Sequence, residues 1–409
     1  MAINLIRNSR VFFTTNLDSN NRVKVGTVGG TNLKGTPFSE TNTFEIQVLE
    51  GMSFSQGTAQ DTVTLNEAGT APARGQRSFN TALQPADFTF STYMRPFNDT
   101  QLNKITCEER LLWNSFAAPS IATGAIGGAK AAWQESSTTG TLVVTNSDSH
   151  QLQAFGLIIV FSDGAYVIDN CALDTATIDF GLDAIAAIQW AGKGTQVRAL
   201  ENFGIDTTIA NPVTFIGTDL TDTPTDTADV AKVKNTYGKY IANKLSTLAI
   251  QSSIDPANGT NYSVALTGGS ITMSNNLTYL TPANLGTVNL PITYFTGTRS
   301  ITGTVTAYLK TGNDGSGTPQ SAKLLKSLLD NSATAIDPDY GITVSLGGST
   351  NTTRVDLKIP AAMLQIPSVN TEQVISCTMN FTAQGYDSGT NKFDISKSNE
   401  ISIEYKAAA

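Results

Sequence analysis

The sequence predicts a mainly β fold made of two tandem modules of the β-sandwich or barrel type, each with one short amphipathic helix. Three observations lead to this prediction. Apolar residues alternate with period two along most of the chain, helical patterns are confined to two short segments, and one order of elements occurs twice. A chain of 409 residues is also too long for one ordinary core. We therefore expect a first module at 1–205, a linker at 206–240 and a second module at 241–409.

The repeated order is a strand, a second strand, a helix and a last strand that ends in an aromatic residue and a Gly-containing turn. Residue identity between the two copies is low, so the repeat is one of pattern. The first copy occupies 44–55, 88–96, 108–117 and 178–194, and the second occupies 262–274, 301–309, 321–331 and 372–385. A duplicated β-rich module without an evident catalytic cluster indicates a building block.

The first half opens with strand patterns. The runs at 10–16 and 22–28 combine alternation with short β-branched stretches. The run at 152–173 predicts a hairpin that turns at Ser162, Asp163 and Gly164, where Gly supplies a positive φ. Residues 157–161 within it are apolar on both faces. They therefore predict either a central buried strand or one covered by a partner subunit.

Two segments have helical spacing. The first runs from Glu108 to Phe116, with Thr106 as an N-cap and Glu109 as the acid of a capping box. The second runs from Lys323 to Leu329 and has Ser321 at its start. The apolar residues that lie on one face of these helices are Leu111, Leu112, Trp113 and Phe116 in the first, and Leu324, Leu325, Leu328 and Leu329 in the second. One such helix per module would cover one face of a sheet or barrel.

Three segments predict loops or linkers. Residues 216–235 are rich in Thr and Asp and poor in apolar residues, which places the module boundary near 200–240. Residues 65–82 and 120–130 are long loops rich in small residues, and the first of them carries Arg74 and Arg77. Long loops inside β modules are often functional, and in a polymerising protein they are natural arms between subunits.

The charge balance argues against a protein that grips nucleic acid. The 26 basic and 34 acidic side chains give a net charge of −8, and each half of the chain contributes −4. There is no basic tail or stripe of the kind that binds phosphates through counterion release. Charged residues are only 15% of the chain, while Thr, Asn, Ser and Gly are abundant. The surface is therefore neutral and polar, as in many secreted or assembled β proteins.

The chemistry-bearing residues are too scattered to predict an enzyme or a cofactor site. His150 is the only histidine and lies in a polar turn, so a catalytic triad or a Cys–His pair would have to use it. Cys107, Cys171 and Cys377 are odd in number and far apart, which predicts buried free thiols rather than disulfides or zinc ligands. A carboxylate pair of the glycosidase kind, which would meet only in space, stays open. We expect no catalytic residue, no cofactor and no metal.

The three tryptophans could form a sugar-binding platform if they were exposed together. Trp113 lies on the apolar helix face and Trp190 in an alternating strand, which predicts core packing for both. Trp133 follows a loop of small residues and is ambiguous. The N-terminal residues have neither a long apolar stretch nor a cleavage site, so we expect no signal peptide, no membrane span and synthesis in a cytoplasm.

Three runs resemble the tail tube (major tail) proteins of long-tailed bacteriophages. They are PADFTFSTYMRPF at 85–97, CEERLLWNSFA at 107–117 and TATIDFGLDAIAAIQWAGKGTQV at 175–197. They occur in the family's order, and the likeness covers roughly residues 40–200. The second half resembles the family only through its order of elements, because residues 381–385 replace the Trp-x-Gly-x-Gly ending.

The resemblance implies a structural subunit with two tail-tube-type modules. In the family such modules join through their inner sheets into rings, and the rings stack into a tube that conducts viral DNA during ejection. Three two-module chains can replace six single modules, so a trimeric ring is favoured over a hexameric one. The implied partners are further copies of the chain and tape-measure, tail-terminator, baseplate and sheath proteins. DNA would pass without sequence-specific binding, and the location would be the virion, after synthesis in the cytoplasm of the host bacterium.

The candidate contacts between stacked rings are the N-terminal segment 1–35 and the loop 65–82. Their basic residues are Arg7, Arg10, Arg74 and Arg77. Two other functions stay open from the sequence. One is another virion surface protein, such as a baseplate, decoration or adhesin module of the β-sandwich type, and the other is a β-rich carbohydrate-active enzyme.

Overall fold

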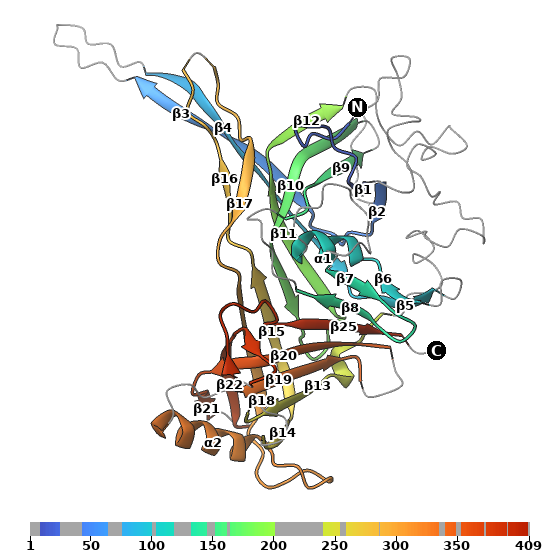
Figure 1. The fold of residues 1–409 in the computed structure, drawn as a ribbon, viewed down its shortest axis with the longest axis vertical. Coiled ribbons are helices and arrows are strands. Elements are labelled where there is room, and N and C mark those ends of the chain that lie inside the picture. Colours follow the sequence, from blue (N-terminus) through green and yellow to red (C-terminus); the bar gives the residue numbers. More distant parts are fainter. Residues whose placement is uncertain are drawn as a thin grey trace, which may run out of the picture.

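The structure of the chain is a computed structural model (Figure 1). It describes residues 9–24, 43–63, 76–99, 104–117, 132–144, 152–161, 164–200, 240–253, 259–285, 287–334, 340–348, 353–371, 374–390 and 392–407. Strands dominate this part of the chain, which holds two α-helices, α1 (Arg110–Ala117) and α2 (Ser321–Thr334). The predicted mainly β fold is confirmed.

The strands of the first half are β1 (Arg10–Thr14), β2 (Thr43–Ile46), β3 (Ser53–Val63), β4 (Arg77–Tyr93), β5 (Pro96–Asp99), β6 (Lys104–Cys107), β7 (Trp133–Glu135), β8 (Gly140–Val143), β9 (Phe155–Phe161), β10 (Gly164–Asp179), β11 (Ala187–Gly194) and β12 (Gln196–Leu200). A 3-10 turn at Asn243–Leu245 opens the second half. Its strands are β13 (Thr247–Gln251), β14 (Asn261–Val264), β15 (Leu266–Ser274), β16 (Leu277–Leu280), β17 (Thr293–Thr296), β18 (Ser300–Tyr308), β19 (Tyr340–Leu346), β20 (Arg354–Leu364), β21 (Ser368–Asn370), β22 (Ser376–Ala383), β23 (Tyr386–Asp387), β24 (Lys392–Phe393) and β25 (Ser402–Lys406).

In the first half, β10 belongs to two sheets. Its first residues pair with β9 and β12, and its last residues pair with β11. The first sheet has the order β2-β1-β9-β10-β12, and the second has the order β3-β4-β11-β10. The strand changes sheets near Asn170, which has a positive φ of 46°. A non-glycine residue with this backbone is uncommon, and Asn tolerates it best.

The second half repeats this pairing. Its strands form the orders β14-β13-β19-β20-β25 and β15-β18-β22-β20, with β20 shared between the two. The equivalent elements are β1 and β13, β2 and β14, β3 and β15, β4 and β18, α1 and α2, β9 and β19, β10 and β20, β11 and β22, and β12 and β25. They follow one another in the same sequence order in both halves.

The two halves share one sheet. Residues Thr175–Asp179 of β10 pair antiparallel with Ser270–Ser274 of β15. This joins the strands into the order β3-β4-β11-β10-β15-β18-β22, and the end of β20 with β21 forms the last edge. We call it the continuous sheet. The halves also interlock elsewhere, because β8, which pairs with β7, adds to β25 of the second half.

A large aromatic core lies behind the continuous sheet. Trp113 of α1 meets Trp190 of β11 edge to face, with ring centroids 4.7 Å apart. The Trp113 Nε1 donates a hydrogen bond of 2.9 Å to the Tyr405 hydroxyl, which ties the first helix to the last strand. Gly192 leaves room for Phe88 to lie across β11, since a Cβ there would stand 2.4 Å from the Phe88 ring. Aromatic burial of this size dominates core energetics.

Two hairpins project from the body (Figure 1). The longer consists of β3 and β4, and the other, β16 and β17, lies in the connection between β15 and β18, the equivalents of β3 and β4. They run side by side, because the Leu83 N–H donates a 2.8 Å hydrogen bond to the Asn289 carbonyl. We call β3–β4 beyond Gln56 the long arm.

Two sequence predictions about local structure are wrong. Residues 77–82, predicted as part of the loop 65–82, belong to β4 and pair with the end of β3. Thr106 does not cap a helix, because it lies in β6 and its hydroxyl donates to a Glu135 carboxylate oxygen. The hydrogen bond to Glu135, which is 29 residues away in sequence, takes the place of the predicted helix cap.

The two predicted helices are confirmed, and several other predicted features lie outside the described residues. The helix at 108–116 is confirmed as α1, and the helix at 323–329 is confirmed as α2. The loop 120–130 and His150 lie outside the described residues, as do positions 206–239 of the linker. Within the described ranges, no helix is both long enough and apolar enough to span a membrane.

Candidate functional site

The two faces of the continuous sheet differ in chemistry. Successive side chains of a strand point to opposite faces, and here one set is buried against the core while the other is not. Nearly every strand presents Ser or Thr on the second face, which we call the hydroxyl face. The Ser and Thr residues of this face, all half-buried or exposed, include Ser53, Ser55, Thr89, Ser91, Thr175, Thr177, Ser270, Thr272, Ser274, Ser300, Thr302, Thr304, Thr306, Ser376, Thr378 and Thr382.

Strand register places these hydroxyls in rows across the sheet. Thr177 lies opposite Thr272, Thr272 opposite Thr302, and Thr302 opposite Thr382. The Thr177 and Thr272 hydroxyl oxygens are 3.2 Å apart, which is hydrogen-bond distance. This row crosses from the first half of the chain to the second without a break, so the two halves present one surface.

The hydroxyl face carries little charge. Outside the long arm, the charged side chains among its described strand residues are Asp87, Asp179 and Lys193. The Lys193 ammonium lies 3.2 Å from an Asp87 carboxylate oxygen, so this cation is paired within the face. Binding a nucleic-acid backbone needs several cations that neutralise phosphates. This surface can contact a polyanion through polar groups without holding it.

The predicted contact residues lie apart from one another. Arg77 lies on the long arm, with its guanidinium 4.9 Å from the ring centre of Phe79, which is 43% exposed. Arg10 lies in β1, where its Nε donates a 3.0 Å hydrogen bond to Glu45 of β2. Arg7 and Arg74 lie outside the described residues. The structure therefore places one of these arginines on a projecting arm and another in an ion pair on the body.

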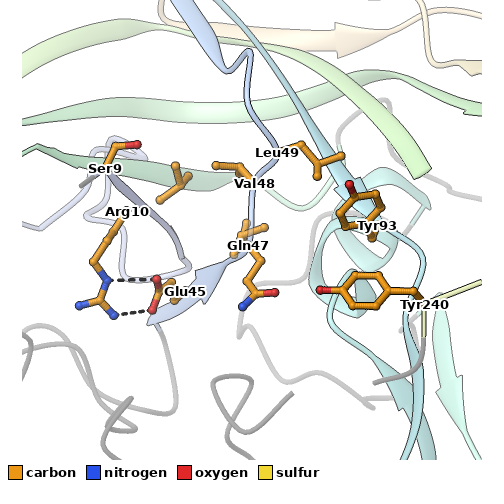
Figure 2. A pocket seen from close by; sticks show the side chains of 10 residues that line it. Ser9, Arg10, Glu45, Gln47, Val48, Leu49, Tyr93 and Tyr240 are labelled. Carbon is orange, nitrogen blue, oxygen red and sulfur yellow. Dashed lines mark hydrogen bonds and ion pairs between the residues drawn. The ribbon is translucent and has the colours of Figure 1, made fainter. Parts of the chain in front are cut away.

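A pocket of about 300 Å³ lies beside the Arg10–Glu45 pair (Figure 2). Val48, Leu49, Tyr93 and Tyr240 line its far side, and the two tyrosine rings meet edge to face at 5.3 Å. Its lining contains neither a cysteine nor a histidine that could act as nucleophile or base. Among the described residues, the pocket combines one ion pair with two tyrosine rings.

Cysteine and tryptophan side chains serve the core. Cys107, Cys171 and Cys377 are buried and free, and burial raises the pKa of all three thiols above the ordinary range. Trp113, Trp133 and Trp190 are all buried, which resolves the ambiguity at Trp133 in favour of packing. No group of three or more metal-binding side chains occurs within the part of the chain that the structure describes.

Comparison with known proteins finds a relative whose kind is known. The tail tube protein pb6 of Escherichia phage T5 is 29% identical over 395 residues, which cover 94% of this chain and 73% of that protein. The chain is a homologue of a bacteriophage tail tube protein. This confirms the resemblance found in the sequence. The solved SPP1 tail tube matches 41% of this chain and 81% of that chain, with 14% identity and a TM-score of 0.26. No family model matches the sequence.

The tail-tube-like motifs of this homologue now have structural roles. In DFTFST, Phe88 and Phe90 point into the core while Thr89 and Ser91 belong to the hydroxyl face. In the Trp-x-Gly-x-Gly run, the Trp190 Nε1 donates a 3.0 Å hydrogen bond to the Thr92 hydroxyl. The motifs therefore build the continuous sheet and its core.

Sequence reasoning missed the hydroxyl face, although its signal was present. Strand β18 carries Thr302, Thr304 and Thr306 at period two, and β22 carries Ser376 and Thr378 in the same spacing. Such alternation identifies one face of one strand. It could not show that the polar faces of seven strands, taken from both halves, join into one surface.

Proposed function

We propose that this chain is the structural subunit of a bacteriophage tail tube and that its hydroxyl face lines the channel that conducts viral DNA. One observation carries the proposal: a single sheet, built from both halves, has a buried apolar face and an open, nearly uncharged hydroxyl face. A neutral lining suits a conduit, because cations that bind phosphates would slow a polyanion in transit. The virion tail is the location that the homologue indicates.

We propose that the chain holds two tube modules, with boundaries near 205 and 240. The matching strand orders of the two halves support this division, since eight strands correspond in pairing partners and these strands and one helix correspond in sequence order. Low residue identity does not weigh against it, because each module needs only the same alternation of buried and open positions. The intervening segment 206–240 is the proposed linker.

We propose three chains per ring. Counting the β20–β21 edge as one strand, each chain supplies eight strands to the continuous sheet. With strands spaced about 4.8 Å apart and tilted by about 40°, three chains close a barrel roughly 50 Å across between backbones. Six chains would give roughly 100 Å, which is far wider than one DNA duplex requires.

We propose that the long arm and the N-terminal segment 1–35 contact neighbouring rings. The arm projects beyond the body and exposes Phe79 and Val63, and the adjoining hairpin exposes Leu280 and Phe295. Apolar side chains gathered on a projection indicate a surface that becomes covered on assembly. Arg77 belongs to this arm and Arg10 to β1, while the candidate contacts Arg74 and Arg7 lie outside the described residues. Tape-measure, tail-terminator, baseplate and sheath proteins are the further partners of such a tube.

Negative-stain electron microscopy of the purified protein at high concentration tests this function. We expect hollow rings or stacked tubes, and the chain mass per ring separates three subunits from six. A structural role without catalysis also predicts that a panel of polysaccharides stays intact. Compact monomers that form no ring, even when a tail-tip initiator is supplied, would instead favour a decoration or baseplate protein.

A further inference from the structure

The continuous sheet ends at two edges. At one end β3 pairs with β4, and among the described residues no strand pairs with its other side over Gly51–Ser55. At the other end, residues 363–368, where β20 passes into β21, pair with β22 on one side. Among the described residues no strand pairs with their other side. An unpaired strand edge is a template for further pairing, and native proteins normally cover it.

The chain contains its own template for covering these edges. Where its halves meet, the end of β10 pairs with β15, with Thr177 opposite Thr272. These strands are the equivalents of the two open ones, because β15 corresponds to β3 and the end of β10 corresponds to the end of β20 with β21. The junction inside the chain therefore joins the same pair of edges that the chain leaves open at its ends.

Strand register extends the equivalence to single residues. Trp190 lies opposite Phe90, and Phe381 lies opposite Gly303 at the same place in the second half. Counting along the strands from these pairs, Ser53 takes the place of Thr272.

The other open edge follows from the same count. Thr177 lies opposite Gln189, which corresponds to Asn380. The Gln365 N–H donates a 2.9 Å hydrogen bond to the Asn380 carbonyl. Gln365 therefore takes the place of Thr177.

Burial differs between the joined edges and the open ones. Ile271 and Met273 of β15 are 0% exposed, whereas their counterparts Met52 and Phe54 at the open edge are only partly buried. At the other open edge, Ile366 is 53% exposed. Covering each open edge with the other would bury these apolar side chains in the way the internal junction already does.

We infer that residues 363–367 of one chain pair antiparallel with residues 51–55 of the next chain, with Gln365 opposite Ser53. The partner is a second copy of this chain, and the inference rests on the proposed ring-forming function. The contact joins two different edges, so it is heterologous and closes only when a rotation returns to the first chain. Every module boundary around the ring then has the same kind of strand pairing, whether it lies within a chain or between chains.

Disulfide cross-linking of assembled tubes tests the register. Directly opposite residues in an antiparallel pair have Cα atoms about 4.5–5.5 Å apart, which suits a disulfide. The three natural cysteines are buried, so they give little background. In tubes of the double variant Ser53→Cys with Gln365→Cys, we expect oxidation to replace the monomer band by a ladder. The ladder ends at the number of chains per ring.

Three controls make the result specific. The variant Thr177→Cys with Thr272→Cys should cross-link within one chain and leave its mass unchanged. The variant Ser55→Cys with Gln365→Cys, which is displaced by two residues or about 7 Å, should cross-link far less. A mixture of the two single variants, Ser53→Cys and Gln365→Cys, should give dimers only, because each chain then has one reactive edge.

The outcomes separate the junction from the tube function. Tubes that form but show no cross-link, or cross-link equally well out of register, would overturn the junction while leaving the tube intact. Failure of the unaltered protein to form rings would overturn the tube function itself. As a second measurement, Gln365→Lys with Ser53→Lys should abolish ring closure through like charges in opposition, and Gln365→Glu with Ser53→Lys should restore it.

Discussion

Asp169 is the buried anion that holds three separate segments of the first half together. Its side chain is 0% exposed, and one carboxylate oxygen accepts hydrogen bonds from Arg198 at 2.8 Å and from the Val23 backbone N–H at 2.9 Å. Removing one partner of a buried pair leaves the other uncompensated. We expect Asp169→Ala to lower the free energy of unfolding of the unassembled chain by about 3 kcal/mol, as measured by urea denaturation.

Asp183 provides the matched control for Asp169. It is also paired, with Lys244 at 3.6 Å, but its side chain is 87% exposed. Surface ion pairs contribute little because water already solvates both groups. Asp183→Ala should therefore change the free energy of unfolding by less than about 0.5 kcal/mol. Equal losses in the two variants would contradict the role assigned to burial.

Glu109 makes stability depend on pH. Burial raises the pKa of its carboxyl to about 8, and repulsion from Glu108 adds to the shift. In the unfolded chain the pKa returns to its ordinary value near 4.5, so between these values the unfolded state releases a proton that the folded state keeps. The free energy of unfolding therefore falls as pH rises from 4.5 to 8, and this loss is complete above 8.

Glu109→Gln removes that titration. Relative to the unaltered protein, we expect the variant to gain thermal stability at pH 8 and to gain much less at pH 5. Melting temperatures of the unassembled chain at both pH values measure the difference. Glu50→Gln, at an exposed turn, should leave the pH dependence unchanged. If Glu109→Gln behaved in the same way, Glu109 would not be the group responsible.

Sequence reasoning succeeds for single residues whose environment is local. The burial of Trp113 and Trp190 follows from their apolar faces, and both are in the core. Asp169 could not be recognised, because Val23 lies 146 residues away and is brought near only by the fold. The helix cap predicted at Thr106 is wrong for the same reason, since its partner Glu135 lies on another strand.

The long arm is the element whose role is easiest to separate from folding. Phe79 is 43% exposed and packs against the Arg77 guanidinium, so it contributes little to the core of its own chain. Burying a Phe side chain fully contributes about 2 kcal/mol. We expect Phe79→Ala to leave rings intact and to give shorter tubes that fall apart at lower temperature, as measured by electron microscopy and light scattering.

Ser78→Ala is the control on the same arm. It removes a hydroxyl 3.3 Å from the Thr62 hydroxyl on the neighbouring strand but leaves the exposed apolar area in place. Tube length should stay the same in this variant. Tubes of Phe79→Ala that match the unaltered protein in length and thermal stability would exclude Phe79 from the contact between rings.

Elements with strong periodicity were predictable, and their pairing was not. The strand patterns at 88–96, 178–194, 301–309 and 372–385 predict strands where β4, β11, β18 and β22 occur, and helical spacing predicts α1 and α2. The small residues at 65–82 predict a loop, whereas β4 extends through residues 77–82 by pairing with β3. Pairing with β3 supplies backbone hydrogen bonds to residues 77–82, so the composition of this segment did not predict its structure.

At the scale of the whole molecule, a lysine placed on the hydroxyl face tests whether this face contacts DNA in transit. Thr272 lies at the centre of this face, in the row that joins the two halves. Thr272→Lys would place one cation per chain at the same height of the channel, and these cations would repeat in every ring. Because bound phosphates release counterions, we expect tubes of this variant to retain short duplex DNA, with retention falling steeply as salt increases.

The location of the bound DNA decides whether Thr272 faces a channel. Leu329→Lys adds the same charge on α2, where Leu329 is 48% exposed and lies outside the continuous sheet. DNA held by Thr272→Lys tubes should resist added nuclease, because the tube wall encloses it, whereas any DNA held by Leu329→Lys tubes should be degraded. Unaltered tubes should retain none at physiological salt. If nuclease digests the DNA on Thr272→Lys tubes just as fast, the hydroxyl face lies on the outside, and the direction in which the sheet curls would have to be reversed.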